Sequence, residues 1–314
     1  MDTQKNKIKL RLKTRNTPTE DTDLPNKVSF DENLTESQSK VSSKCEKISS
    51  VTIESCSSDQ VEIEKQKMLV PKEITSQRIQ IPNQSDDGES SSFVKRLNGK
   101  KVLVIDIETT GLPERKKGFH VGKDEYYDYT SLDKYESSRI VSIASYYSEN
   151  FDVSKIDDKN LQYFVIKPTD FTIDNNSTTT MINKITQEKA VQQGLDFRAV
   201  ISLHLDHALR QCEYIVSHNA FFDVNILLSE LHRFHCDEQL TYVKKLYDED
   251  KILCIGEIGR NICRIPMKWQ TTYKMPKMYE LYEHLYKKRP ELLHDAKSDV
   301  ISVLEIISQL NSSD

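Results

Sequence analysis

Apolar residues gather in the last two-thirds of the chain in a pattern that predicts strands and helices. Positions 102–107 form a run typical of a strand buried on both faces, and a second apolar run covers 140–144. Positions 214–216 predict a short strand, with a helix following from residue 221. A last helix is expected near the C-terminus. The inward-facing residues of these helices are Ile226, Leu227, Leu231 and Phe234 in the first, and Val300, Val303, Leu304, Ile307 and Leu310 in the second.

The first ninety or so residues lack such a pattern. They contain a single glycine, Gly88, almost no aromatic residues, and a stretch rich in serine and lysine at 37–58. A segment of this composition cannot bury enough apolar surface to offset its chain entropy, so residues 1–95 are predicted to form a disordered arm. Residues 96–314 fit one folded domain. Positions 7–13 alternate basic and apolar residues, which fits either docking on a partner or on phosphates, or a solvated basic tail.

One carboxylate interrupts the apolar run at 102–107, and a second follows the run directly. Side chains alternate along a strand, so Asp106 and Glu108 are expected to point to the same side. Two carboxylates side by side on a buried strand repel each other and lose hydration, a cost that rarely persists unless a cation lies between them. Oxygen ligands suit a hard ion such as Mg²⁺ or Mn²⁺. The pair therefore predicts a metal site.

Two further aspartates follow in later segments. Asp223 falls in the first turn of the helix expected after 214–216, and Asp299 lies on the C-terminal helix. His294 precedes Asp299 by five residues, which is about 140° around a regular helix and roughly 7.5 Å along it. The two side chains cannot share one helical face. His294 is therefore expected at the start of the helix or in the preceding loop.

Four carboxylates are enough to hold two divalent ions. Two such ions roughly 3.5–4 Å apart can stabilise the attacking and the leaving oxygen of an in-line displacement at phosphorus. Histidine, with an ordinary pKa of about 6.5, can accept a proton from water at physiological pH. His294 is therefore the candidate general base, and the whole set predicts a metal-dependent nuclease.

Three motifs carry a resemblance to a known family. DIETTG at 106–111, HNAFFD at 218–223 and HDAKSD at 294–299 resemble, in order, the motifs of DEDDh-type 3′–5′ exonucleases. The resemblance covers about residues 101–310 and implies an α/β domain of ribonuclease-H type, with a mixed central sheet flanked by helices. It implies metal ligation by Asp106, Glu108, Asp223 and Asp299, and general-base work by His294. The residues that it implies near the terminal nucleotide are Thr109, Thr110, Gly111, Leu112, Asn219 and Phe222.

One segment departs from this family. Residues 113–139 form a long charged and aromatic insertion, where compact bacterial members have a shorter turn. The stretch that closes it, YESSRIVSIAS at 135–145, is more similar to exonucleases of large DNA viruses and of some eukaryotes. This similarity suggests a viral lineage.

Charge and cysteine content narrow the class of protein and its expected compartment. A net charge of −5 argues against a protein that coats nucleic acid by bulk attraction, but an exonuclease grips only a few nucleotides at a 3′ end. No stretch approaches twenty apolar residues, so no membrane span is expected. Scattered cysteines without a secretory leader suggest free thiols and an intracellular protein, whether cytoplasmic, nuclear or in a viral factory.

Three points stay open at the level of sequence. A non-catalytic nucleic-acid-binding or scaffold protein that keeps the exonuclease fold is the alternative to an enzyme, although a binding module has no reason to retain mutually repelling carboxylates. The substrate is DNA or RNA, since the 2′-hydroxyl is sensed by pocket shape. The arm is a candidate tether to a protein partner such as a polymerase.

Overall fold

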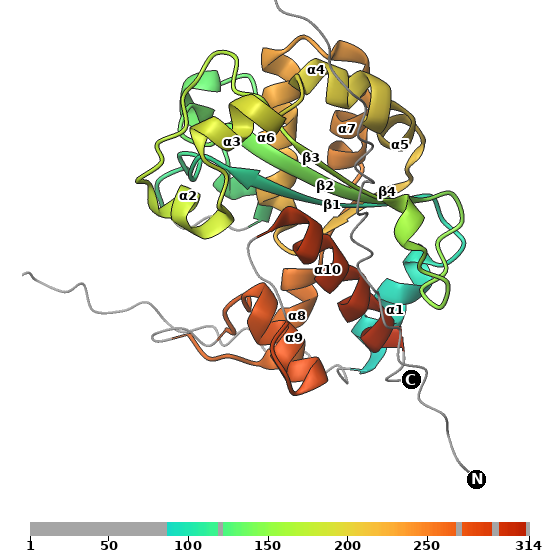
Figure 1. Ribbon diagram of the computed structural model, residues 1–314. Helices are drawn as coiled ribbons and strands as arrows, with labels where there is room; N and C mark the ends of the chain where they lie inside the picture. Colours follow the sequence, from blue (N-terminus) through green and yellow to red (C-terminus); the bar gives the residue numbers. More distant parts are fainter. Residues whose placement is uncertain (1–86, 119–121, 268–271, 291–294, 312–314) are drawn as a thin grey trace, which may run out of the picture. The chain divides into compact units, whose positions relative to one another are not determined.

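The computed structural model describes residues 87–118, 122–267, 272–290 and 295–311 (Figure 1). All of them belong to the compact unit Pro82–Asp314. Helix α1 (Asp87–Leu97) crosses the boundary expected between residues 95 and 96, and its Phe93 and Val94 are buried. The end of the segment assigned to the arm is therefore helical, because its few apolar residues have a core to pack on. The rest of the arm lies outside the described residues, and its disorder stays a prediction.

A five-stranded mixed sheet forms the centre of this unit, with the strand order β3-β2-β1-β4-β5. The strands are β1 (Val102–Thr109), β2 (Ile140–Ser148), β3 (Leu161–Val165), β4 (Tyr214–Ser217) and β5 (Ile252–Cys254). β1, β2 and β3 pair antiparallel, whereas β4 pairs parallel with both β1 and β5. The strands predicted from the three apolar runs are confirmed, and so is the mixed sheet.

Helices cover both faces of the sheet (Figure 1). The chain between β3 and β4 forms α2 (Thr178–Asn183), α3 (Gln187–Gln193), α4 (Phe197–Val200) and α5 (Asp206–Gln211). Helices α6 (Ala220–Arg233) and α7 (Asp237–Asp248) connect β4 to β5, and α8 (Ile255–Cys263), α9 (Met278–Tyr286) and α10 (Ala296–Asn311) follow. The two helices predicted from apolar stripes, α6 and α10, are confirmed. Within the described residues, no helix is long and apolar enough to cross a membrane.

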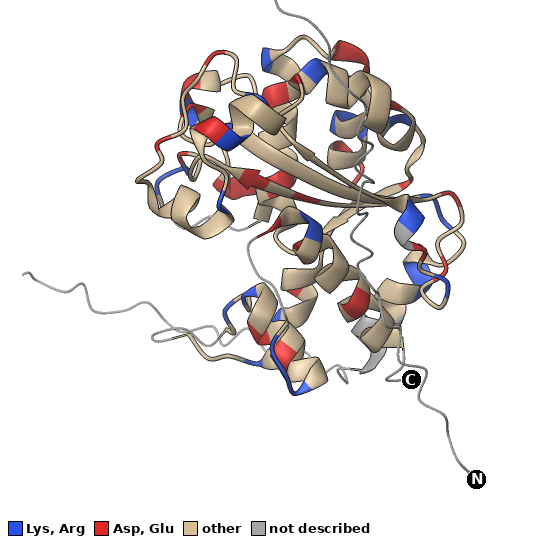
Figure 2. Ribbon diagram, in the orientation of Figure 1, with Lys and Arg blue, Asp and Glu red and all other residues tan. Residues whose placement is uncertain are grey.

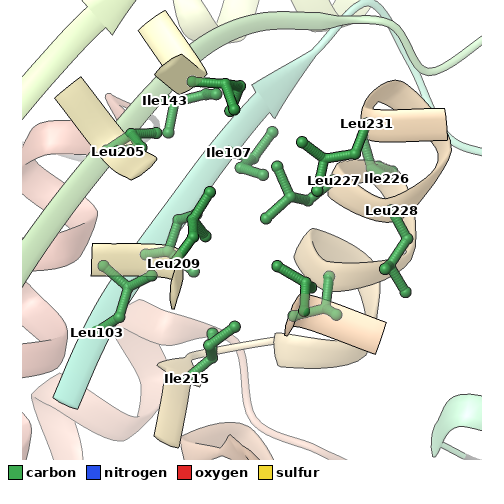
Figure 3. Packing of buried hydrophobic residues seen from close by; sticks show 14 of the residues in the cluster. Leu103, Ile107, Ile143, Leu205, Leu209, Ile215, Ile226, Leu227, Leu228 and Leu231 are labelled. Carbon is green, nitrogen blue, oxygen red and sulfur yellow. The ribbon is translucent and has the colours of Figure 1, made fainter. Parts of the chain in front are cut away.

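The alternation of β1 divides its side chains between two apolar cores. Leu103 and Ile107 pack with α6 and with the helical segment before β4 (Figure 3). Val104 packs on the opposite face, in the core that α10 shares. Asp106 and Glu108 follow Val104 at intervals of two residues, so both carboxylates point to the side that α10 covers. The register of β1 thereby directs the acidic pair toward the C-terminal helix.

The described residues of the 113–139 insertion, 113–118 and 122–139, are folded onto the domain. They contain two short 3-10 helices, η1 (Gly122–Glu125) and η2 (Leu132–Tyr135). Tyr126 and Tyr135 are buried. An insertion with this many aromatic residues brings apolar surface of its own, and burying it stabilises an ordered structure over a solvated loop.

Candidate metal centre

Three carboxylates from two elements converge near the C-terminal end of β1. One oxygen each of Asp106, Glu108 and Asp299 lies within 4.8 Å of the others, and we call these residues the acidic cluster. Asp106 and Glu108 project from β1, and Asp299 lies in the first turn of α10. Figure 2 shows acidic positions toward this end of β1. The structure thus brings together three of the four carboxylates predicted for the site.

The fourth carboxylate, Asp223, binds the backbone of the same strand. The pairing of β1 with β4 stops at Val104, because β4 ends at Ser217 and the chain turns into α6. Asp223 lies in the first turn of α6, and its Oδ1 accepts a hydrogen bond from the amide of Ile107 at 3.0 Å. Its Oδ2 accepts another from the Ser217 hydroxyl at 2.7 Å. These two bonds fix the carboxylate against the edge of β1.

The pKa values of these carboxyl groups are raised. Burial raises the pKa of Glu108 to about 8, and the charges of Asp299 and Asp223 add to the rise. Burial also raises the pKa of Asp223 to about 7, against the opposing effect of its hydrogen bonds. The pKa of Asp106 rises well above its ordinary value because of burial and then of the charges of Asp223 and Asp299. Carboxylates in this state gain from any nearby positive charge.

The donor set fits a divalent cation that prefers oxygen. Oxygens within 4.8 Å of one another can ligate a common ion, and hard cations such as Mg²⁺ and Mn²⁺ take oxygen ligands. Asp106 and Glu108 are partly exposed, whereas Asp223 and Asp299 are buried. An ion and a phosphate group can therefore approach the cluster from the side of the β1 residues.

Two polar residues that were not predicted for the site lie close to it. Asn183, the last residue of α2, donates to the carbonyl of Thr109 at 3.2 Å and also hydrogen-bonds the Glu108 side chain. Asp295 adds to the rise in pKa that burial and the nearer carboxylates cause in Asp106 and Glu108, so it is a fifth acid within electrostatic range. Asp295 lies within the third sequence motif, so the sequence contains a sign of it. Asn183 lies in none of the three motifs, and only the packing of α2 brings it to β1.

His294 lies outside the described residues. Helix α10 begins at Ala296, and Asp295 directly precedes it. The position of the histidine and its role as a general base stay predictions.

The turn after β1 is held by the end of the insertion. The Thr110 hydroxyl donates to the Ser137 carbonyl at 3.0 Å. A Cβ at Gly111 would lie 2.6 Å from the same carbonyl oxygen, so only glycine fits there. Thr109 is buried and its hydroxyl donates to the carbonyl of Gly111 at 2.6 Å, whereas Leu112 is 68% exposed. Among these four residues, Leu112 presents its side chain to solvent and the threonines use theirs within the protein.

The second motif contains both structural and accessible residues. His218 is buried, its ring Nε2 is hydrogen-bonded to the Pro276 carbonyl at 2.9 Å, and its own carbonyl accepts from the amide of Gly256 at 2.8 Å. Phe222 packs on the apolar core beside α6. Asn219 directly precedes α6 and lines an open pocket. His218 therefore closes the turn between strand and helix, while nucleotide contact by Asn219 and Phe222 stays a prediction.

Comparison with known proteins finds similarity among solved structures. No family model and no curated protein sequence matches the chain. Exonuclease I of E. coli in complex with a dT13 oligonucleotide is similar with a TM-score of 0.44 and 14% identity, over 69% of this chain and 41% of that one. The Mg²⁺- and Mn²⁺-bound form of S. pombe Pop2p is similar with a TM-score of 0.46 and 16% identity, over 72% of this chain and 89% of that one.

These similarities concern the fold. The chain spans less than half the length of the exonuclease I chain that it matches. The viral lineage suggested by residues 135–145 finds no support in these structures.

Proposed function

We propose that this chain is a metal-dependent 3′–5′ exonuclease that hydrolyses phosphodiester bonds at the 3′ end of DNA or RNA. The observation that carries the proposal is the convergence of the acidic cluster within 4.8 Å, with Asp223 fixed against the same strand. The 3′–5′ direction rests on the resemblance of the three sequence motifs and on their order.

The energetics of the cluster favour an enzyme over a binding module that merely keeps the fold. Burial and mutual repulsion raise the pKa values of Asp106, Glu108 and Asp223, so their ionised forms destabilise the folded chain. Apolar residues at the same strand and helix positions would avoid this cost. A cation that binds all of these carboxylates offsets it, which is why the arrangement favours metal-dependent chemistry.

The residues of the chain take distinct parts in the proposed reaction. Asp106, Glu108 and Asp299 hold the cations, and Asp223 completes the set from the edge of β1. Two divalent ions, when bound, supply charge stabilisation to the attacking and the leaving oxygen. His294 takes a proton from the attacking water as the water oxygen forms its bond to phosphorus. The bond from phosphorus to the 3′ oxygen breaks, and this oxygen takes up a proton from solvent. The products are a 5′-mononucleotide, which keeps the phosphorus, and a shortened strand with a 3′-hydroxyl.

Contact with the terminal nucleotide is assigned to Leu112 and Asn219. Leu112 follows Glu108 by four residues and its side chain is 68% exposed, which makes it available to pack on the last base. Asn219 lies four residues before Asp223 and faces an open pocket. The backbone of the Thr109–Gly111 turn directly precedes Leu112, and Phe222 lies three residues after Asn219. Contact with the terminal nucleotide is assigned to these residues as well.

Cleavage of labelled oligonucleotides tests the proposal. Single- and double-stranded DNA and RNA, labelled at the 5′ end, are incubated with the full chain and Mg²⁺ or Mn²⁺. The expected result is a ladder that shortens from the 3′ end and disappears with EDTA, and a blocked 3′ end should resist. The same panel decides between DNA and RNA. Cleavage that resists EDTA would contradict the proposal, and binding without cleavage would favour the non-catalytic alternative.

The role of His294 needs a variant of its own. His294→Ala should lower kcat about 10²- to 10⁴-fold while metal and substrate still bind, since general-base contributions are of this size. His284→Ala, at an exposed histidine of α9, is the matched control. Single-turnover cleavage at saturating Mn²⁺ measures the chemical step. A near wild-type rate would remove His294 from the reaction and leave the four carboxylates in place.

The N-terminal arm is proposed to tether the domain to a protein partner. Its alternation of basic and apolar residues at 7–13 supports this role, since an extended segment of that kind can add to the edge of a sheet. A pull-down that compares the full chain with a chain lacking residues 1–86 tests it. Equal recovery of a replication or processing protein by both would contradict the tether.

A further inference from the structure

A pocket open to solvent lies between the insertion and the helices that follow β4 and β5. Its volume of about 50 Å³ is small, so only one edge of a ligand can enter it. Four charged residues line it, Arg115 and Glu125 from the insertion and Glu257 and Arg260 from α8. Tyr126 and Phe221 add aromatic surface. The pocket therefore combines hydrogen-bonding groups of both kinds with an apolar lining.

Described residues of the insertion form one wall of this pocket. Gly122 has a φ of +59°, and a Cβ there would lie 3.3 Å from the ring of Phe221, so the insertion packs closely on α6. Lys123 forms an ion pair with Asp250 at 2.6 Å. The Phe221 ring in turn meets Tyr247 edge to face, with 6.3 Å between ring centroids. Contacts to α6, α7 and the residues after α7 thus anchor this wall.

The charged groups of the pocket alternate in sign. Arg115 pairs with Glu125 at 2.6 Å, and Arg260 pairs with Glu257 at 2.5 Å. The hydrogen bonds that Arg260 donates to Glu257 raise the pKa of Arg260, and the charge of Glu125 adds to this rise, so the two ion pairs lie within electrostatic range of each other. The four side chains are between 27% and 45% exposed. Each therefore keeps donors or acceptors available to a ligand.

We propose that this pocket binds the edge of a nucleobase of the substrate strand, and specifically of a base with an exocyclic amine. The inference rests on the proposed function and names the part of the substrate that this surface takes. Carboxylates accept hydrogen bonds from amines, and arginines donate to ring nitrogens and carbonyls, so the alternating set matches the edge of adenine, cytosine or guanine. The partly exposed ring of Phe221 covers apolar surface of the base. A phosphate is disfavoured because Glu125 and Glu257 repel it.

The pocket lies close to the candidate metal centre. Asn219 lines it and directly precedes α6, whose first turn carries Asp223. Burial raises the pKa of Tyr126, and the charges of Glu125 and Asp223 add to the rise, so Tyr126 is within electrostatic range of Asp223. The bound base therefore belongs to one of the last nucleotides before the 3′ end. The insertion that departs from the resembled family supplies one wall of a substrate pocket.

Binding of oligonucleotides with a single abasic residue tests the inference. The full chain with Asp106→Asn, which blocks the proposed cleavage, is titrated with 5′-labelled strands whose abasic residue is moved stepwise from the 3′ end. One position near that end should weaken binding roughly tenfold, the size expected for one well-packed base. Thymine at that position should bind more weakly than adenine. Arg260→Gln and Glu125→Gln, each added to this chain, should remove both differences.

Arg210→Gln is the matched control, because Arg210 on α5 is also an ion-paired arginine, at 2.8 Å from Glu238. It should keep the abasic penalty. A penalty that is equal with and without the two pocket variants overturns the inference. A neutral methylphosphonate that weakens binding only when the pocket is intact also overturns it, since the pocket would then hold a phosphate.

The two proposals fail in distinguishable ways. If Arg260→Gln lowers the thermal stability too far for binding to be measured, Glu125→Gln decides the result. Absence of metal-dependent cleavage by the chain with Asp106 intact overturns the proposed function. If cleavage persists and the pocket variants do not change the loss of affinity caused by the abasic residue, only this inference is overturned.

Discussion

Arg139 and Glu230 bury opposite charges, whereas the acidic cluster gathers like charges in the same domain. The Arg139 and Glu230 side chains are 1% and 2% exposed. The guanidinium donates to the two oxygens of Glu230 at 2.6 and 3.3 Å and to Asp170 at 2.8 Å. In the acidic cluster, the neighbouring charges that shift the pKa values of Asp106 and Glu108 are carboxylates. Folding alone satisfies the first group of charges, and the second gains from an added cation.

This difference separates charges that stabilise the fold from charges that mark a functional site. Arg139 directly precedes β2, Glu230 lies on α6, and Arg233 extends the network to Glu136 at the end of the insertion, at 2.5 Å. The network therefore joins the insertion, the sheet and a helix without any outside partner. Burial of charge is common to both groups, so burial by itself does not mark a site. The sign of the neighbouring charges does.

Removing one carboxylate from the acidic cluster is the strongest test of this comparison. Asp106→Asn should lower cleavage by at least about 10³-fold, because displacing a bound ion removes several kcal/mol of transition-state stabilisation. The same variant should raise the Tm in EDTA, since it relieves repulsion. Asp133→Asn, at an aspartate whose side chain is 72% exposed, is the control and should change neither quantity. A lower Tm for Asp106→Asn would mean that the acidic cluster stabilises the fold, and the comparison would break.

Removing one of the opposite charges should act on stability instead. Arg139→Gln leaves Glu230 buried without its main partner, and the free energy of unfolding should fall by about 3–5 kcal/mol in urea denaturation. Arg139→Gln combined with Glu230→Gln should recover part of the loss, because no buried carboxylate is left unpaired and the Asp170 side chain is 45% exposed. Lys244→Gln, which removes an exposed pair with Asp248, should cost about 0.5 kcal/mol or less. Equal losses for the buried and the exposed pair would refute the structural role.

The pH dependence of stability should report the like charges directly. Glu108 has an ordinary pKa of 4.5 and a folded value of about 8, and Asp223 changes from 3.8 to about 7. Between these values the folded chain binds more protons than the unfolded chain, so metal-free stability should fall as pH rises from about 4 to about 8. A loss of at least about 1 kcal/mol, or about 2–4 °C in Tm, is expected for a domain of this size.

Thermal unfolding in EDTA across this range measures the effect. Asp106→Asn should flatten the profile, and Mg²⁺ should raise the Tm more at the alkaline end than at the acidic end. A profile that rises with pH in the wild type and is unchanged in the variant would show that other groups control stability.

The acidic cluster could be predicted from sequence because its members carry local signals. Strand alternation directs Asp106 and Glu108 to one side, and Asp299 lies in a recognisable motif on an apolar-striped helix. The Arg139 and Glu230 pair could not, since the two residues are 91 positions apart and only the packing of β2 on α6 joins them. Sequence periodicity shows which face a side chain takes, but it does not show which distant side chain meets it.

The contact of Asp223 with β1 also depended on information absent from the local pattern. Its hydrogen bond to Ile107 exists because β4 ends early and leaves the edge of β1 open. A strand one or two residues longer would have paired with that amide. The extent of a short strand is set by its neighbours in the sheet, which is why the apolar run at 214–216 predicted the strand without predicting the gap.

Truncation should produce the smallest effect, because both groups of charges lie within Pro82–Asp314. A chain that starts at Asp87 loses only a segment whose composition gives it no part in the core. Its Tm should therefore match that of the full chain, and its rate of cleavage of short oligonucleotides should stay within a few-fold. A chain that starts at Asn98 is the contrast. It also loses Phe93, Val94 and Leu97, which are 4%, 2% and 0% exposed. Each buried side chain of this size contributes about 1.5–3 kcal/mol, so the loss of all three should lower the Tm by roughly 10 °C or more. Loss of most activity by the chain that starts at Asp87 would make the arm part of the enzyme, and the boundary between arm and domain would move toward the N-terminus.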